Sequence, residues 1–261
     1  MRIATWNVNS IRSRIDRVVS WLERNDIDVL AIQETKCRED QFPGLELSSM
    51  GYEFAHVGIN QWNGVALISR VGLDDIATSF ADDQPMFGDP ALLEPRAIGA
   101  TCGGVRVWSF YVPNGRELDN PHYAYKLAWL ERLRQVGADW LAADPDAQIA
   151  LTGDWNVAPL DEDVWDMSVF EGRTHVSAPE RAAFQAMIDT GYADVVRPHT
   201  PGQYTYWDYQ QLAFPKKRGL RIDFILASQA LASRVDTAWI DREERKGKGA
   251  SDHAPVVIEI S

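Results

Sequence analysis

Residues 148–156 read QIALTGDWN, an apolar run that ends in a glycine, an acid and an amide. A short apolar run bounded by glycine predicts a buried β-strand. Asp154 and Asn156 would then stand at the end of this strand, and an extended chain would point both side chains to one face. A carboxylate beside an amide suits metal binding or the positioning of a water molecule. A turn rich in Asp and Asn after a strand is the alternative interpretation of the same letters.

Other apolar runs of the chain also end in polar side chains. Strand-like runs are expected at 2–6, 29–33, 64–70, 105–112, 148–152, 220–227 and 256–260. Asn7 follows the first run, Glu34 follows the second, and Tyr111 lies near the end of the fourth. Active sites are commonly built where strands of a rigid sheet end, so we expect these side chains to converge. Glu34 could be a ligand of a hard cation. Taken alone, it could equally be a solvated glutamate or one at the N-terminus of a helix.

Segments with a helical pattern are fewer than the strands. Apolar residues recur with helical period over 11–22 and 123–140, and a third helix is expected over 179–189. The chain contains no linker, repeat or low-complexity segment, so we expect a single domain over 1–261. Several strands follow one another through turns, which favours an α+β fold in which a sheet sandwich carries helices on its outside.

The charge of the chain limits the classes of partner. Its 261 residues include 26 Lys and Arg against 38 Asp and Glu, a net charge of −12. Such acidity argues against a protein that coats polyanions with its whole surface, but it allows a local basic face or carboxylates that hold a cation. Cys37 and Cys102 lie far apart, which argues against a disulfide framework or a cysteine zinc site. No signal peptide or membrane-spanning run is visible, so we expect a soluble, cytoplasmic protein.

Residues 219–224, GLRIDF, place an acid inside an apolar strand. A charge there is costly unless it is paired. Arg221 is one candidate partner of Asp223, and His253 is the other. An Asp–His pair would fix the tautomer of the imidazole and raise its pKa, as in acid–base catalysis. Asp252 and His253 precede a proline-fixed turn, which favours a functional role for both. The other histidines lack metal-binding spacing and are expected to be structural: His56, His122, His175 and His199.

Together these segments resemble the exonuclease III family of apurinic/apyrimidinic endonucleases, which belongs to the endonuclease/exonuclease/phosphatase superfamily. The matching pieces follow the family's order: WNVNS (6–10), QETK (33–36), NGVALIS (63–69), YVPNG (111–115), GDWN (153–156), YTYWDY (204–209), GLRIDFILAS (219–228) and SDHAP (251–255). The WN, GDxN and SDH pieces occur across the superfamily, whereas QETK, YVPNG and GLRID favour its DNA-repair branch. The resemblance implies a four-layer αββα sandwich of two mixed sheets. It also implies hydrolysis of a phosphodiester by an activated water with Mg²⁺ or Mn²⁺.

The resemblance assigns one group of residues to the metal and the water. Glu34 would be the main metal ligand, and Asn7 and Asp252 would support it. Asp154 would hold and deprotonate the attacking water or sit at a second metal position. Asn156 would help to orient that water or contribute to the metal site.

A second group would contact the phosphate and the sugar. His253, steered by Asp223, would stabilise the charge that develops on the phosphate, and Tyr111 and Asn114 would donate hydrogen bonds to it. A flipped-out, base-less sugar, which is cheap to extrude from the duplex, would meet the following side chains: Tyr206, Leu220 and Ile222, with Trp207 beside them. Asn9 stands where some relatives carry an acid, and Tyr206 where Trp or Phe is expected. The balance of lesion cleavage, 3′-phosphatase and 3′→5′ exonuclease activity therefore stays open.

Basic residues gather in 213–249, next to two of the expected catalytic segments. Lys and Arg there number 9 against 5 Asp and Glu, a balance of +4, while the rest of the chain holds 17 against 33. Lys216, Lys217 and Arg218 precede the strand of Asp223, and Arg116 follows YVPNG. Solvated loops are the ordinary interpretation of such charges, but this position favours contacts with DNA phosphates. We expect a monomer that acts on double-stranded DNA with abasic sites or 3′ ends and has no membrane contact.

Two other functions remain open on the sequence. A phosphatase or phosphodiesterase of the same superfamily would act on lipid or small phosphates, although the basic loops and YTYWDY argue against it. A catalytically dead scaffold would bind duplex DNA without cleaving it, although every expected acid, amide and histidine is present. The sequence settles neither the number of metal ions nor the choice between Asp154 and His253 as general base.

Overall fold

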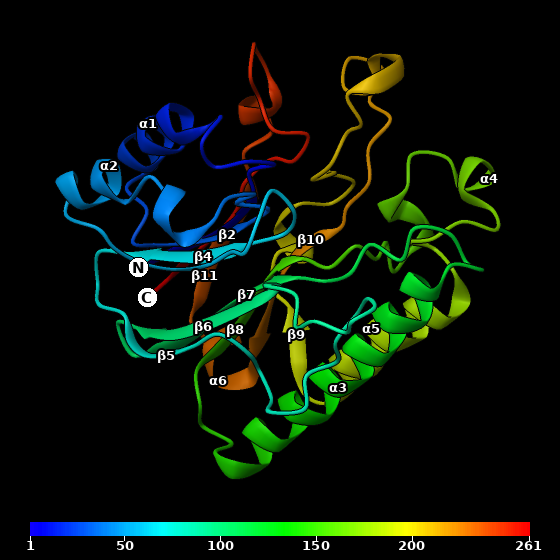
Figure 1. Cartoon of the computed structure of the whole chain (residues 1–261), viewed down its shortest axis with the longest axis horizontal. Helices are drawn as coiled ribbons and strands as arrows, with labels where there is room; N and C mark the ends of the chain where they lie inside the picture. The colour runs from blue at the N-terminus through cyan, green and yellow to red at the C-terminus, as the bar shows by residue number, and fades with distance from the viewer.

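Two six-stranded β-sheets pack face to face at the centre of the molecule (Figure 1). The computed structural model describes all residues from 1 to 261. The first sheet contains, in order across it, β11 (Val235–Ile240), β12 (Val256–Ile260), β1 (Arg2–Asn7), β2 (Val29–Gln33), β4 (Val65–Ser69) and β3 (Glu53–Val57). The second contains β5 (Asp74–Ala77), β6 (Ala97–Cys102), β7 (Val105–Tyr111), β8 (Ile149–Asp154), β10 (Asp223–Ser228) and β9 (Tyr192–Asp194).

Each sheet has one parallel pair at its centre. β1 runs parallel to β2, and β7 runs parallel to β8, whereas the other pairs are antiparallel. A parallel pair needs a crossover connection, and α1 (Ile15–Asn25) and α3 (Pro121–Ala143) supply the two crossovers. Because parallel strands end at the same edge, Asn7 lies beside Gln33 and Tyr111 lies beside Asp154. β1 also packs against β8 across the sandwich, so the two edges face each other.

Helices cover the outer face of each sheet, which confirms the expected αββα sandwich (Figure 1). α1 and α2 (Gly44–Ser49) lie on the first sheet, while α3 and α5 (Ala178–Asp189) lie on the second. Asn120 caps α3 by accepting a hydrogen bond from the backbone N–H of His122 at 2.9 Å, and Pro121 fits the first turn. None of the helices is both long and apolar enough to cross a membrane.

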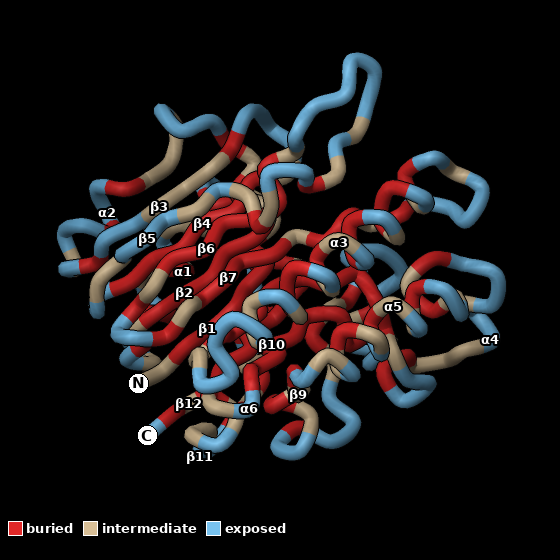
Figure 2. Tube along the Cα trace, turned by 90° about the horizontal axis from the view of Figure 1, so that it is seen from below, coloured by how far each residue is buried: buried red, intermediate tan, exposed pale blue.

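Alternation along the strands divides the core into three main layers. Ile3 and Val29 point between the sheets, whereas Trp6 and Leu30 point outward and pack with the apolar face of α1. A third layer of large side chains, which includes Trp129 of α3, fills the outer side of the second sheet. Each such buried side chain contributes about 1.5–3 kcal/mol to stability. Figure 2 shows the buried strands surrounded by exposed loops.

The strand expected over 220–227 is shorter than the sequence suggests. It begins only at Asp223, because Leu220 forms isolated bridges with Val164 and Tyr206 instead of pairing along the sheet. This detour leaves Asp223 at the first position of β10, directly opposite Asp154 of β8.

Two loops project from the sandwich and are in contact through Arg245. One contains the short turn η4 (Gln210–Leu212) and the other contains η5 (Arg242–Arg245), drawn in golden and red tones in Figure 1. Arg245 joins them, because its Nη2 donates to the carbonyl oxygen of Trp207 at 3.0 Å and its guanidinium lies 5.2 Å from the ring centre of Phe214.

Candidate active site

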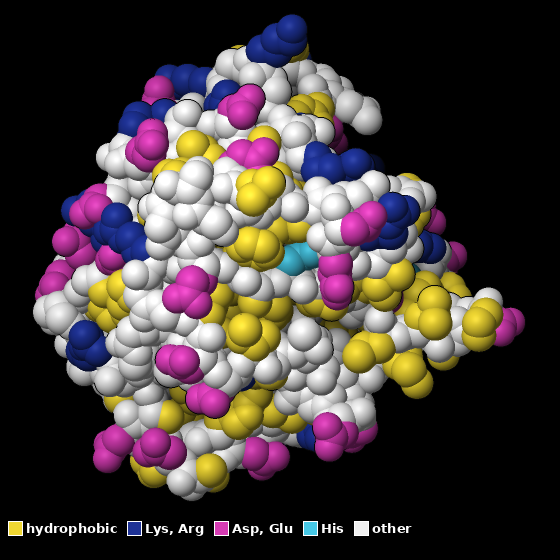
Figure 3. Space-filling view, turned by 60° about the vertical axis from the view of Figure 1, so that its left-hand side comes forward, with side chains coloured by type: hydrophobic (Ala, Val, Ile, Leu, Met, Phe, Trp, Pro, Cys, Tyr) yellow, Lys and Arg dark blue, Asp and Glu magenta, His cyan; other side chains and the backbone are white.

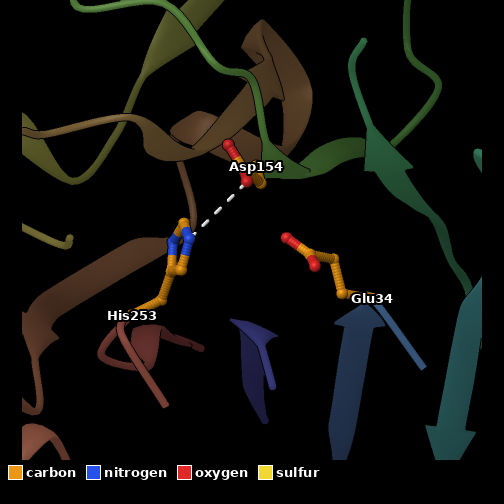
Figure 4. Close-up of side chains that lie close together, drawn as sticks. All are labelled: Glu34, Asp154 and His253. Atoms are coloured by element: carbon orange, nitrogen blue, oxygen red, sulfur yellow. Dashed lines mark ion pairs between the residues drawn. The ribbon is translucent and has the colours of Figure 1, made fainter. Parts of the chain in front are cut away.

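Glu34, Asp154 and His253 converge from three different elements (Figure 4). Glu34 follows β2, Asp154 ends β8, and His253 precedes β12, so the cluster joins both sheets. One ligand atom from each residue lies within 4.8 Å of the others. Figure 4 shows both carboxylates turned toward a shared space that the imidazole also faces. The expected convergence of polar strand ends is therefore present.

Asn7 bridges the two carboxylates of this cluster. Its Nδ2 donates to Oε1 of Glu34 at 2.8 Å and to Oδ2 of Asp154 at 3.0 Å, while its Oδ1 accepts from the backbone N–H of Asn9 at 3.0 Å. The amide nitrogen thus faces the carboxylates, and a metal ligand role for Asn7 requires its oxygen to turn inward. On the outer side, Nζ of Lys36 lies 2.7 Å from Oε2 of Glu34.

Asp223 supports His253 from behind. Nδ1 of His253 lies 2.9 Å from Oδ2 of Asp223, and Nε2 lies 3.8 Å from Oδ2 of Asp154. Arg221, the other candidate partner of Asp223, pairs with Asp194 at 2.7 and 2.8 Å. Burial lowers the pKa of His253, but the carboxylates of Asp223 and then Asp154 outweigh it and raise the pKa to about 10. The imidazole is therefore a cation at neutral pH, with Nδ1–H donating to Asp223.

The acids of the cluster differ in how easily they ionise. Burial raises the pKa of Asp154 to about 7, and the charges of Asp223 and Glu34 add to the rise against the opposing effect of His253. Burial acts in the same direction on Glu34, but Lys36, Asn7 and His253 together outweigh it, and the pKa of Glu34 falls below its ordinary value.

This donor set fits a hard divalent cation. Carboxylate and amide oxygens are the ligands that Mg²⁺ and Mn²⁺ prefer. Asp154 is buried close to the charges of Asp223 and Glu34, and a cation would offset this negative charge. Asp252 lies beside the cluster and not in it. Its Oδ1 accepts from Nδ2 of Asn9 at 3.0 Å, which turns this half-buried carboxylate toward Asn9.

Asn156 occupies a turn, so the expectation of an extended chain from Asp154 onward is not met. Its φ of 52° is left-handed, and its N–H donates to Oδ1 of Asp154 at 3.0 Å. The side chain is held on both sides, since Nδ2 donates to the carbonyl of Val112 at 3.0 Å and Oδ1 accepts from Nδ2 of Asn114 at 3.1 Å. The turn and the functional interpretation of GDWN are therefore compatible.

Tyr111 lies between the cluster and a buried arginine. The guanidinium of Arg96 sits 4.8 Å from the ring centre of Tyr111, and its Nη1 donates to the carbonyl of Tyr111 at 3.2 Å. Burial raises the pKa of Tyr111 well above its ordinary value, and the carboxylate of Glu34 adds to the effect. The phenol therefore keeps its proton and can donate it in a hydrogen bond.

A groove of about 1010 Å³ opens beside the cluster. Five residues that were expected to contact the substrate line it, namely Asn114, Arg116, Tyr206, Arg218 and Leu220. The ring of Tyr206 lies 4.9 Å from the ring of His253, which places the groove next to the cluster.

Ile222 does not line this groove, contrary to expectation, and Trp207, which was expected beside the sugar and not in the lining, does not line it either. Each is only 2% exposed. Ile222 packs into a small apolar cluster with Leu220. Trp207 faces the core between the sheets, because its neighbour Tyr206 takes the outward position and bridges Leu220 and His253. Both residues can support the groove wall only from behind.

Some basic side chains of the loops in 213–249 are exposed, and others pack against aromatic rings. Lys216 and Lys217 are exposed, and the guanidinium of Arg218 lies 4.8 Å from the ring centre of Trp165 at the groove. Arg242 and Arg245 are occupied with aromatic rings of the neighbouring loop. Figure 3 shows Lys and Arg mainly over the upper part of this face, mixed there with Asp and Glu, while the lower edge carries mainly Asp and Glu.

Several residues of the site carried no recognised signal in the sequence. His175 lines the groove, and its Nδ1 donates to the carbonyl of Asn156 at 2.6 Å, although it was expected to be structural. Lys126 of α3 is fully buried beneath the site. Helical spacing could have revealed it, because Lys126 falls on the same face as Trp129 and Leu133, which are buried.

Comparisons with known proteins agree on one family and one fold. The model of the endonuclease/exonuclease/phosphatase family matches residues 4–253. Exodeoxyribonuclease III of Haemophilus influenzae is 28% identical over 274 residues, with both chains fully covered. The 3′ phosphatase NExo from Neisseria, solved with a product DNA hairpin, superposes with a TM-score of 0.91 at 36% identity over 100% of this chain and 99% of its own. An AP endonuclease from Archaeoglobus fulgidus gives a TM-score of 0.91 at 34% identity over the same shares.

Proposed function

The chain belongs to the endonuclease/exonuclease/phosphatase family, and on that premise we propose that it is a DNA-repair nuclease that hydrolyses phosphodiester bonds with the help of a metal ion. One observation carries the proposal. Glu34, Asp154 and the Asp223–His253 pair converge at the edge of a groove whose walls carry arginines. Acids that attract a cation therefore stand beside cations that attract a phosphate.

Glu34 and Asp154 are the residues that would hold Mg²⁺ or Mn²⁺, with Asn7 and Asp252 at the edge of the site. A bound cation of this kind would add positive charge beside the scissile phosphate and lower the pKa of water. Glu34 is suited to this position because Lys36 and Asn7 keep it ionised. Mg²⁺ is the ion we assign, since small hard cations favour such oxygen ligands.

The proton of the attacking water goes to Asp154 in this proposal. Asp154 is assigned as the base because its carboxylate faces the space that Glu34 and His253 also face, where the water would lie. A bound cation would lower its pKa from the value of about 7 that it has without one. His253 is already protonated, so it serves as a charged donor to a phosphate oxygen and not as the base. Tyr111 and Asn114 donate further hydrogen bonds to the same phosphate, and Asn156 orients the water.

The groove beside the cluster is the proposed site of the nucleotide on the 3′ side of the cut bond. Tyr206 and Leu220 would contact the sugar, and Arg116 and Arg218 would contact the backbone. Lys216 and Lys217 would follow the duplex further out. We assign incision 5′ to abasic sites, 3′→5′ exonuclease and 3′-phosphatase activity to this one site, in a monomeric, single-domain cytoplasmic enzyme.

A comparison of substrates tests the function. An end-labelled duplex with one abasic site, a duplex with a 3′-phosphate and an inositol phosphate are incubated separately with Mg²⁺. We expect incision 5′ to the lesion and release of the 3′-phosphate, with no turnover of the inositol phosphate. Turnover of the inositol phosphate without cleavage of either duplex would replace the nuclease with a small-phosphate hydrolase. Tight duplex binding without cleavage would indicate a scaffold.

A further inference from the structure

We infer that Lys126 is a positioning residue of this nuclease, which locks the loops of Asn114 and Asn156 together from beneath the active site. The inference rests on the proposed function, because the two asparagines are assigned to the phosphate and the water. Lys126 lies on α3, and its side chain is 0% exposed. A lysine in such a place needs a partner for each of its three N–H groups.

Two of the partners are main-chain carbonyls of the active-site loops. Nζ of Lys126 donates to the carbonyl of Asn156 at 2.6 Å and to that of Asn114 at 3.1 Å. The first loop follows β8, and the second follows β7. One ammonium group thus joins the ends of the two parallel strands that deliver Tyr111 and Asp154.

Glu180 of α5 is the third partner, and both of its carboxylate oxygens accept several hydrogen bonds. Oε1 of Glu180 accepts from Nζ of Lys126, from Oγ1 of Thr174 at 2.7 Å and from the N–H of His175 at 3.0 Å. Oε2 accepts from the N–H and the hydroxyl of Ser177 at 3.1 and 2.5 Å. The ion pair is therefore a fixed anchor, and the loops are tied to the packed helices α3 and α5.

The carbonyl of Asn156 explains why such an anchor is useful. The backbone of this residue is left-handed, a conformation that Asn tolerates better than most residues but that costs more than the right-handed one. Lys126 and His175 both donate to its carbonyl oxygen. The same backbone turn sends the N–H of Asn156 to Oδ1 of Asp154. Release of the carbonyl would let the turn relax, and Asp154 and the amide of Asn156 would lose their mutual alignment. Small losses of alignment in a catalytic site cost rate more than they cost affinity.

Lys126→Met tests the inference because it keeps the length of the side chain and removes the donors. Tyr192→Phe is the control, since it removes the buried hydrogen bond from Tyr192 to the carbonyl of Gly137, near the far end of the same helix. Single-turnover cleavage of an abasic duplex in Mg²⁺, DNA affinity in EDTA and thermal unfolding are measured for each. We expect Lys126→Met to cleave about 100-fold more slowly with DNA affinity within about threefold of wild type. Tyr192→Phe should lose stability and keep the rate.

A second readout needs neither DNA nor metal. In protein labelled with ¹⁵N at asparagine, the signals of Asn114 and Asn156 should shift or broaden in Lys126→Met, while Asn25 stays unchanged. A folded Lys126→Met protein with a wild-type rate and unchanged signals overturns the inference. So does a rate loss that Tyr192→Phe reproduces at equal stability. If Lys126→Met does not fold, Glu180→Gln decides, with a rate loss of about fivefold or more in its favour and an unchanged rate against it. If wild type cleaves no DNA, the proposed function fails, and the asparagine signals still decide on Lys126.

Discussion

The Asp223–His253 pair shows how one residue sets the charge of another. Asp223 is 1% exposed, and it directs its carboxylate to Nδ1 of His253. The imidazole therefore keeps its proton far above the pH at which a free histidine loses it. The sequence singled out both residues but left Arg221 as a rival partner of Asp223. In the structure Arg221 pairs with Asp194 and not with Asp223. Residues 194 and 221 are far apart in the sequence, so local spacing cannot reveal this contact.

Asp223→Asn is predicted to lower the rate of cleavage and to change its dependence on pH. His253 must be charged in the proposed reaction, so wild-type activity should persist until the pH approaches about 10, the pKa of His253. An amide at position 223 lowers that pKa, and the alkaline loss of activity should then begin at a lower pH. The measurement is a single-turnover pH–rate profile, with Asp236→Asn, an exposed change on β11, as the control. If Asp223→Asn loses activity at the same alkaline pH as wild type, the Asp223–His253 pair does not set the charge state needed for cleavage.

At the scale of the elements, the parallel strands at the centre of each sheet were predictable, whereas the edge strands β3 and β5 and the interior strand β6 were not. β1, β2, β7 and β8 are apolar runs, and they were expected within a residue or two at most of their bounds. The edge strands β3 and β5 are largely exposed, so they lack the apolar pattern that marks a strand. β6 contains a glycine and small residues that weaken the same signal. Tertiary pairing, which short-range patterns do not contain, makes these segments strands.

Gly153 shows how closely β8 must approach β7. A Cβ atom at Gly153 would meet the carbonyl oxygen of Phe110 at 1.9 Å, and the φ of Gly153 is +140°. Gly153→Ala should therefore push Asp154 away from its neighbours, destabilise the fold by about 2–3 kcal/mol and reduce cleavage more than tenfold, at about the level of a misplaced catalytic group.

Gly104→Ala is the matched comparison for this change. Gly104 also has a positive φ, +84°, but no atom lies within 4 Å of a Cβ there. This variant should lose only about 1 kcal/mol and keep its activity. Urea unfolding and single-turnover cleavage check both variants. Equal losses in the two would mean that backbone strain, and not the approach of β8 to β7, limits position 153.

For the molecule as a whole, charge is distributed unevenly along the chain. The net charge of the whole chain is −12, but in the segment 213–249 basic residues outnumber acidic ones. The structure refines this count, because Arg221 is buried with Asp194 and Arg245 is held among aromatic rings. Arg218 lines the groove, and Lys216 and Lys217, which precede it, are exposed, as are Lys246 and Lys248. A count along the sequence cannot separate these two groups, since burial decides which charges reach a partner.

Neutralising three basic residues at and before the groove should weaken DNA binding and its dependence on salt. The triple change of Lys216, Lys217 and Arg218 to Gln removes up to three phosphate contacts, and each contact contributes about 0.9 to the slope of log affinity against log salt. Binding of a fluorescent duplex is measured across a salt series, with Arg132→Gln and Arg134→Gln on α3 as the control pair. A slope equal to that of wild type would show that these side chains make no phosphate contacts and are ordinary solvated charges.

Metal-dependent cleavage through Asp154 is the central claim, and one experiment addresses it directly. Wild type and Asp154→Asn are stripped with EDTA and mixed with an end-labelled abasic duplex, and Mg²⁺ is then restored. We expect no cleavage in EDTA, recovery of wild type with Mg²⁺, and a loss of about 100- to 10,000-fold in Asp154→Asn while the variant still folds and binds the duplex. Full cleavage in EDTA, or an Asp154→Asn rate within about tenfold of wild type, would contradict this claim.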